Sequence, residues 1–222
     1  METASDERAV GQYRTHGMLI IAGSVLALAG MAVHPSGGGK VMDMVRDLAA
    51  NGTFNAYVHG FLIAVYLGLT LGFFGLTRWL GGDRIVAQAG FVAYAASAVA
   101  ATAAAMSAGF VNRTLAFAYL EAKPEQVDSV IAAFRVAGAF NFAWGRMWMI
   151  ALSAAILLWS IELVRRTGSE RLLGWFGIAL GAVSIAGFVL GLIPLTVVAL
   201  IGIIAAQTVW SVGVGVLMLR SK

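Results

Sequence analysis

The stretch 172–219, LLGWFGIALGAVSIAGFVLGLIPLTVVALIGIIAAQTVWSVGVGVLML, contains no charged residue. A helix rises about 1.5 Å per residue, so about 20 apolar residues cross the hydrocarbon core of a bilayer. The stretch is therefore long enough for two crossings. Gly191 permits a tight reversal, and Pro194 cannot continue a helix. The sequence thus predicts two membrane helices, at 172–193 and 195–219, joined by a very short link.

Four earlier segments also have the length and apolar composition of a membrane crossing. They lie at 16–34, 56–79, 85–110 and 130–163. The last of these is longer than one crossing requires, and it follows Lys123-Pro124-Glu125, where proline suits the first position of a helix. We expect its first turns to stand outside the membrane. The predicted fold is all-α, a single transmembrane domain over 1–222 with six spans.

The composition agrees with a protein whose main solvent is lipid. The chain is 60% hydrophobic and 12% charged, whereas a soluble domain is about 25% charged. Cysteine is absent, which excludes a disulfide framework, a thiolate metal site and an iron–sulfur cluster. The basic residues flank apolar segments and form no single patch, so no nucleic-acid partner is predicted. We expect the polar residues 1–16 to precede a retained first helix and not a cleaved signal.

The basic residues also predict the orientation of the chain. One side of the predicted bundle has Arg8, Arg14, Arg78, Arg84, Arg165, Arg166, Arg171, Arg220 and Lys222. The other side has Lys40, Arg46, Arg113 and Lys123. Cytoplasmic loops carry the excess of lysine and arginine. Both termini are therefore predicted to lie in the cytoplasm, and the loops 35–55 and 111–127 outside.

Two local patterns bear on packing. The third span has alanine, serine or threonine at nearly every position from Ala93 to Ala108, and small residues let membrane helices approach closely. We expect this helix at the centre of the bundle, although a generally alanine-rich composition is an alternative reason. In the first outer loop, 41–48 shows helical spacing of apolar residues, typical of a short amphipathic helix on the membrane surface. The segment 114–122 is a second candidate of this kind.

Two histidines lie near the predicted outer boundary, on consecutive spans. His34 ends the first span and His59 opens the second. Two imidazoles at one depth can hold a haem iron, a copper ion or a zinc ion, and Met42 and Met44 offer soft ligands for copper. The alternative is that each histidine only caps or snorkels at a helix end.

The fourth span carries two arginines in apolar surroundings. Arg135 and Arg146 are eleven residues apart and so share one helix face, while Asn141 points away from it. An arginine within a span costs about 2.5–3.5 kcal/mol on insertion scales. Arg146 either snorkels to the nearby outer boundary or binds an anion or polar head group.

These side chains, with one more arginine, form the predicted site. Arg113 leaves the third span on the same outer side, so we expect one basic, outward-open pocket there. Its predicted residues are His34, His59, Arg113, Arg135, Asn141 and Arg146. Glu162 is at the cytoplasmic end, so the span interiors lack the carboxylates that proton-coupled transporters commonly use. Gln207 and the mid-span serines either line a polar path or hydrogen-bond neighbouring helices.

Three sequence features resemble a group of uncharacterised six-helix bacterial membrane proteins. They are Leu76-Thr77-Arg78-Trp79-Leu80 at the end of the second span, a polar outer loop before a long fourth helix, and a basic turn leading to Leu173-Gly174-Trp175-Phe176-Gly177. The resemblance implies a bacterial inner membrane and supplies no activity.

Three functions follow as hypotheses. The first is binding or transport of a small anionic or amphipathic ligand through the basic pocket. The second is a membrane redox protein or metalloenzyme that holds haem or copper with His34 and His59. The third is a structural or accessory subunit that packs against a membrane protein partner or a further copy of itself.

Overall fold

The structure is a computed structural model, and it describes residues 4–34 and 41–221. The regular elements of this described part are all helical. They are α1 (Ala4–Ala32), α2 (Val41–Trp79), α3 (Ile85–Met106), α4 (Asn112–Glu121), α5 (Val127–Val164), α6 (Gly168–Val189) and α7 (Val197–Leu219). A π-helical turn, Ser107–Val111, joins α3 to α4, and a 3₁₀ turn, Pro124–Gln126, opens α5.

Six helical segments of the described residues are long and apolar enough to cross a membrane. They are Gly11–Ala32, Asp43–Trp79, Ile85–Glu121, Pro124–Val164, Gly168–Val189 and Val197–Leu219. Each contains or closely matches one predicted span, so the all-α fold class with six spans is confirmed. The protein is an integral, multi-pass membrane protein in contact with the lipid bilayer.

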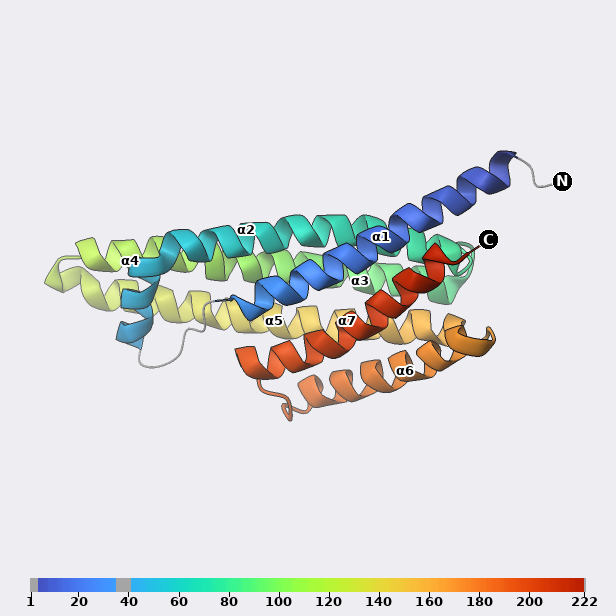
Figure 1. Cartoon of the computed structure of the whole chain (residues 1–222). Coiled ribbons are helices and arrows are strands. Elements are labelled where there is room, and N and C mark those ends of the chain that lie inside the picture. Colours follow the sequence, from blue (N-terminus) through green and yellow to red (C-terminus); the bar gives the residue numbers. More distant parts are fainter. Residues whose placement is uncertain (1–3, 35–40, 222) are drawn as a thin grey trace.

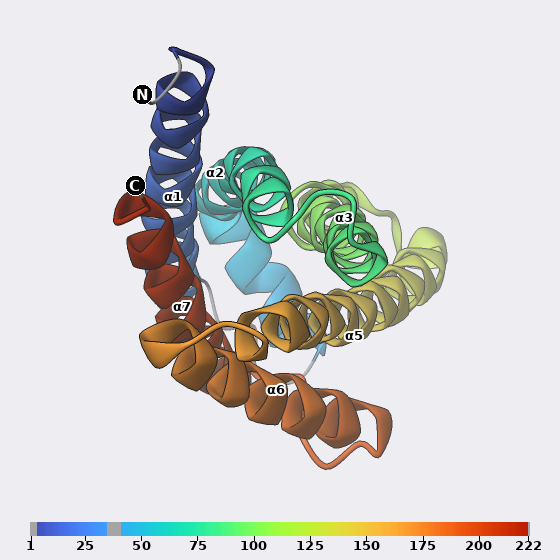
Figure 2. The same ribbon diagram turned by 90° about the vertical axis from the view of Figure 1, so that its right-hand side faces the viewer.

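The spans form a ring in the order α1, α2, α3, α5, α6, α7, and α7 closes the ring on α1 (Figure 2). α1 and α7 approach closely where two glycines meet. A Cβ atom on Gly17 would lie 2.8 Å from the Gly215 carbonyl oxygen, and a Cβ on Gly215 would lie 2.8 Å from that of Gly17. Without side chains at these positions, the two backbones pack directly against each other.

The predicted central position of the alanine-rich helix is wrong. α3 lies in the wall of the ring between α2 and α5 (Figure 2). Its small residues serve a close contact with these neighbours, because Ala100, Ala101 and Ala105 are buried. Small side chains predict close approach of two helices, but close approach needs only one or two neighbours and not a central position.

The turn between α6 and α7 confirms the predicted hairpin, but the link runs over 190–196 and is longer than the predicted one, because α6 ends at Val189 and α7 begins at Val197. Gly191 has a φ of 70°, which favours glycine. The Leu192 N–H donates to the Gly187 carbonyl (2.8 Å), and the Gly191 N–H donates to that of Phe188 (3.4 Å), the Schellman pattern that ends a helix. The Thr196 hydroxyl then accepts from the Ala199 N–H (3.4 Å) and caps the start of α7.

The first described turns of α1 and the last turns of α7 lie at the same end of the bundle, which we call the terminal end (Figure 1). The turns from α2 to α3 and from α5 to α6 lie there too. At the opposite, distal end, α2, α3 with α4, and α5 extend well beyond the turn between α6 and α7. This extension is the protrusion. That the terminal end faces the cytoplasm stays a prediction from the basic residues.

The protrusion has a small core of its own, in which Val45, Ala116 and Phe134 are buried. The predicted amphipathic segment 41–48 is helical, as the first turns of α2, which turn across the bundle (Figure 1). Its Val45 packs against α4 and α5, so the segment covers protein as well as facing outward. The second predicted segment, 114–122, is the greater part of α4. Lys40 and the other residues of 35–40 lie outside the described residues, as do the side chains of Val41 and Met42.

The core of the terminal half is an aromatic stack across the ring. Phe73 of α2, Trp159 of α5 and Trp210 of α7 stack with ring centroids 5.0 Å and 6.3 Å apart. The indole N–H of Trp159 donates to the hydroxyl of Thr77 and the carbonyl of Ala87, each at 3.2 Å. These two contacts satisfy the indole N–H within the protein and fix α5 against α2 and α3.

Candidate functional site

The two histidines meet at the distal side of the ring. His34 follows the end of α1, and His59 lies within α2. Their Nε2 atoms are 2.9 Å apart, and the rings stand edge to face with centroids 4.7 Å apart. His59 is only 3% exposed, while His34 is partly exposed. The histidine pair therefore joins α1 to α2 by an imidazole–imidazole hydrogen bond.

The backbone of α2 sets which nitrogen of His59 carries the proton. His59 Nδ1 lies 2.8 Å from the Asn55 carbonyl oxygen. A carbonyl can only accept, so we assign the proton of the neutral ring to Nδ1. His59 Nε2 then presents a lone pair, and His34 Nε2 donates to it. This hydrogen bond thus uses the lone pair of His59 Nε2 and orients the ring of His34 at the end of α1.

The π-helical turn between α3 and α4 forms the wall behind His59. Asn55, one turn before His59 and 4% exposed, donates through Nδ2 to the carbonyl of Ala108 in that turn (2.9 Å). A Cβ atom on Gly109 would lie 2.5 Å from the Cβ of His59, so a larger residue there collides with the histidine. The Ser107 hydroxyl donates to the Ala137 carbonyl of α5 (3.1 Å). π-helical turns occur frequently at functional sites.

Arg113 is held within the protrusion. Its Nη2 donates to the Thr53 hydroxyl (3.2 Å), and its guanidinium lies over the ring of Phe117, 5.5 Å from the centroid. The side chain also passes Gly52, where a Cβ would lie 2.9 Å from the arginine Cγ. Arg113 therefore ties α4 to the early part of α2, and no hydrogen bond among the described residues joins it to His59.

The three predicted residues of α5 lie apart from the histidine pair. Arg135 and Arg146 are exposed and Asn141 is partly buried. No described hydrogen bond or ion pair connects any of them with His59. The structure therefore brings together two of the six predicted residues, His34 and His59, and distributes the others over α4 and α5.

Arg146 lines an open groove on the wall of the ring, with a volume of about 690 Å³. The other lining residues are apolar. They are Phe142, Ala143, Met147, Ile150 and Ala151 of α5, and Leu195 from the link between α6 and α7. In the described part of the chain, Arg146 has neither an ion-pair nor a hydrogen-bond partner. The groove thus combines one guanidinium group without a described partner, that of Arg146, with an apolar lining.

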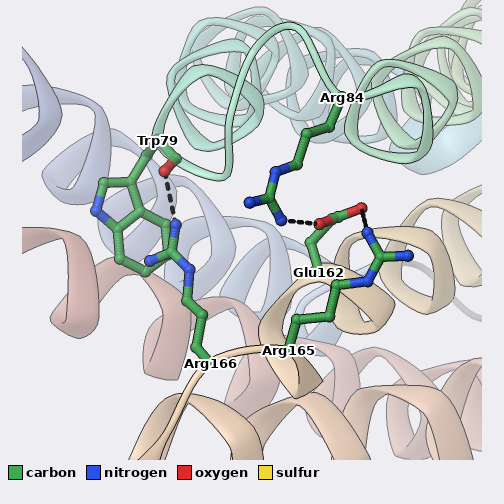
Figure 3. Close-up of polar contacts among 5 residues, drawn as sticks. All are labelled: Trp79, Arg84, Glu162, Arg165 and Arg166. Carbon is green, nitrogen blue, oxygen red and sulfur yellow. Dashed lines mark hydrogen bonds and ion pairs between the residues drawn. The ribbon is translucent and has the colours of Figure 1, made fainter.

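A cluster of charged and aromatic side chains at the terminal end was not predicted (Figure 3). Glu162 of α5, 1% exposed, accepts from Arg84 through one carboxylate oxygen (2.6 Å) and from Arg165 through the other (2.8 Å). The hydrogen bond and charge of Glu162 raise the pKa of Arg84. The sequence analysis used these arginines only to predict the orientation of the chain. The apolar residues around Glu162 were the one sequence feature that could have indicated a buried carboxylate.

Arg166 completes the cluster. Its guanidinium lies 4.0 Å from the ring centroid of Trp79 and donates to the Trp79 carbonyl (2.8 Å). The Trp79 indole in turn donates to the Ser221 hydroxyl (2.7 Å). The cluster therefore joins the ends of α2, α5 and α7 and the start of α3, as a structural clasp in which the buried carboxylate is paired with two arginines.

No family model, curated protein or solved structure matches the chain. Its membrane character therefore rests on the six apolar helices themselves, and the site must be interpreted from its own geometry. The resemblance to six-helix bacterial proteins stays a prediction.

Proposed function

We propose that the protein binds an amphipathic ligand with an anionic head group, a membrane lipid, in the groove of Arg146. One observation carries the proposal: the groove of about 690 Å³ pairs a single cation with apolar lining residues. An acyl chain fits the apolar part, and a phosphate or carboxylate offsets the charge of the guanidinium.

The depth of Arg146 suits such a ligand. Counting about 20 residues back from the terminal end of α5 reaches Arg146, and Leu195, which leaves the membrane between α6 and α7, lines the same groove. Both observations support a position of the Arg146 guanidinium near the boundary of the bilayer, where lipid head groups lie. Met147, Ile150 and Ala151 continue the groove toward the membrane interior, where acyl chains lie.

The proposal is binding at the surface of the ring. The groove lies on the outside of the bundle, and the cavity inside the ring measures only about 40 Å³, which is too small to conduct a lipid. The excess of basic residues at the terminal end supports an orientation in which the groove faces the outer leaflet of a bacterial inner membrane.

Native mass spectrometry of the detergent-purified protein tests this function. The affinity for phosphatidylglycerol, which is anionic, is compared with that for phosphatidylcholine, which is zwitterionic. A basic side chain near the surface contributes about 1 kcal/mol to anionic lipid binding, so Arg146→Ala should reduce the preference for phosphatidylglycerol about fivefold.

Arg135→Ala is the matched control, because Arg135 is an exposed arginine of the same helix, about 16 Å farther along it. This variant should keep the wild-type preference. An unchanged preference in Arg146→Ala, or an equal loss in both variants, would contradict the proposal.

A second candidate function, binding of a metal ion by the histidine pair, has its own support. Histidine ligands of metals typically donate their second N–H to a carbonyl or carboxylate, and His59 has this contact with Asn55. Copper and zinc take imidazole nitrogens as ligands. To bind one ion together, the two Nε2 atoms, now 2.9 Å apart, would have to separate, and His34 would have to release the proton that it donates to His59. The described residues contain no group of three or more His, Cys, Asp or Glu side chains that could hold a metal ion, so further ligands would have to be solvent. Haem fits less well, because its porphyrin would have to lie between two rings that are in contact.

Elemental analysis of protein from metal-supplemented cells, with an absorption spectrum, tests this candidate. Copper or zinc near one ion per chain should be present, and His34→Ala or His59→Ala should remove it. His16→Ala, which changes the remaining histidine at the other end of α1, should retain the metal. A metal-free wild-type protein would count against this second function.

A further inference from the structure

The centre of the ring contains a small, partly open chamber of about 40 Å³. Five helices line it, which are α1, α2, α3, α5 and α7. The lining residues with polar atoms are Ser24, Tyr66, Tyr94, Trp148, Gln207, Thr208 and Ser211. The chamber belongs neither to the groove of Arg146 nor to the histidine pair, and its residues are therefore available for a separate role.

Two buried polar atoms of the chamber have no partner among the described residues. They are the indole N–H of Trp148 and the side-chain carbonyl oxygen of Gln207, on residues that are 8% and 4% exposed. One is a donor and the other an acceptor. Leaving each unsatisfied costs about 1–3 kcal/mol, so both favour a polar occupant.

The orientation of the Gln207 amide follows from its neighbours. The Ser153 hydroxyl donates to the Met149 carbonyl (2.7 Å), so it accepts from the Gln207 amide nitrogen (3.2 Å). The amide oxygen is then the atom left without a partner. Because α5 fixes the nitrogen in this way, Gln207 cannot satisfy its oxygen by exchanging the two ends of the amide.

A third polar atom is the Tyr94 hydroxyl, on a side chain that is 1% exposed. The Thr70 hydroxyl lies within reach of this phenol. It donates to the Tyr66 carbonyl (2.8 Å), so toward Tyr94 it can only accept. The phenol oxygen can itself accept a hydrogen bond. The chamber thus offers one free donor, the indole of Trp148, and two acceptors, the oxygens of Gln207 and Tyr94.

We infer that this chamber is a hydration site in the middle of the membrane-spanning bundle. A cavity needs about 10–15 Å³ to hold one water molecule, so 40 Å³ accommodates about one to three. No lining residue is charged, which disfavours an ion. Water bridges the indole of Trp148 on α5 to the amide of Gln207 on α7 and links helices whose backbones are not neighbours in the ring.

Hydroxyl-radical footprinting with X-rays tests the inference on the purified protein. Radicals formed from a bound water modify side chains beside it, even when bulk solvent does not reach them. Trp148 and Tyr94 should be modified, whereas Trp159, which is fully buried and hydrogen-bonded within the protein, should remain intact. Modification of Trp148 and Tyr94 no faster than that of Trp159 would overturn the inference, and this comparison needs no variant.

A variant tests whether the water depends on the chamber. Gln207→Leu removes the acceptor and should reduce modification of Trp148 to the level of Trp159. Gln88→Leu, at an exposed glutamine of the terminal end, should leave the wild-type pattern. If folded Gln207→Leu protein is still modified at Trp148 as fast as the wild type, the label comes from elsewhere and the chamber is not its source.

Discussion

The two ends of the bundle differ in how their charged side chains are paired. At the terminal end, the buried carboxylate of Glu162 has two arginine partners, and Arg166 has both a ring and a carbonyl. At the distal end, Asn55, Ser107 and Arg113 also have partners within the protein, but Arg146 has no hydrogen-bond or ion-pair partner among the described residues. The comparison indicates that polar contacts hold helices together at both ends, while the distal half also exposes one guanidinium beside an apolar groove.

The largest expected effect concerns the side of the membrane on which each end lies. The chain contains no cysteine. A single introduced cysteine is therefore its only thiol, and labelling of that thiol shows on which side of the membrane the residue lies. Ala118→Cys, exposed on α4, should react with a membrane-impermeant maleimide applied to intact cells. Thr167→Cys, exposed between α5 and α6, should react only after permeabilisation. The reverse pattern would place the distal groove in the cytoplasmic leaflet and invert the predicted topology.

The next effect is on stability at the terminal end. Glu162→Ala removes charge-assisted hydrogen bonds to two arginines, and we expect a loss of about 2–3 kcal/mol in the free energy of unfolding. Glu170→Ala removes only the partly exposed ion pair with Arg166 and should cost less than about 1 kcal/mol. Thermal unfolding in detergent gives both values. Equal effects would show that the clasp is not a special feature of this end.

A smaller effect tests the wall behind the histidines. Gly109→Ala forces a methyl group against His59, and we expect a loss of about 1–2 kcal/mol. Gly138→Ala is the matched control, since a Cβ on Gly138 meets nothing within 4 Å and alanine favours a helix. Thermal unfolding again measures the difference. If Gly109→Ala were as stable as Gly138→Ala, the π-helical turn would not be packed against His59 as described.

Much of the fold follows from hydrophobicity. Unpaired backbone groups and charges are costly in lipid, and an α-helix pairs its backbone groups within one segment. The hairpin could be predicted because Gly191 and Pro194 each have a strong backbone preference. The position of α3 could not be predicted, because small residues show that helices approach closely but not how many neighbours a helix has. A π-helical turn also leaves no compositional mark, so the contact of Gly109 with His59 was not predictable.

The candidate site was predictable only where helix neighbours follow from chain order. His34 and His59 come from consecutive helices joined at the distal end, and they meet. Arg146 lies on α5, which is separated from α1 and α2 in the ring, so its distance from the histidines depended on the packing order. Glu162 shows the same limit, since its partner Arg84 is far away in sequence.

The most direct test of the proposed function is photocrosslinking with an anionic lipid in a bilayer. The probe is a phosphatidylglycerol analogue with a photoreactive acyl chain, and a phosphatidylcholine analogue with the same chain is the control. The account predicts crosslinks concentrated at 142–151 and around Leu195, stronger for the anionic probe and reduced to the control level by Arg146→Ala. Crosslinks spread evenly over the spans, or equal labelling by both probes, would contradict a lipid site at Arg146.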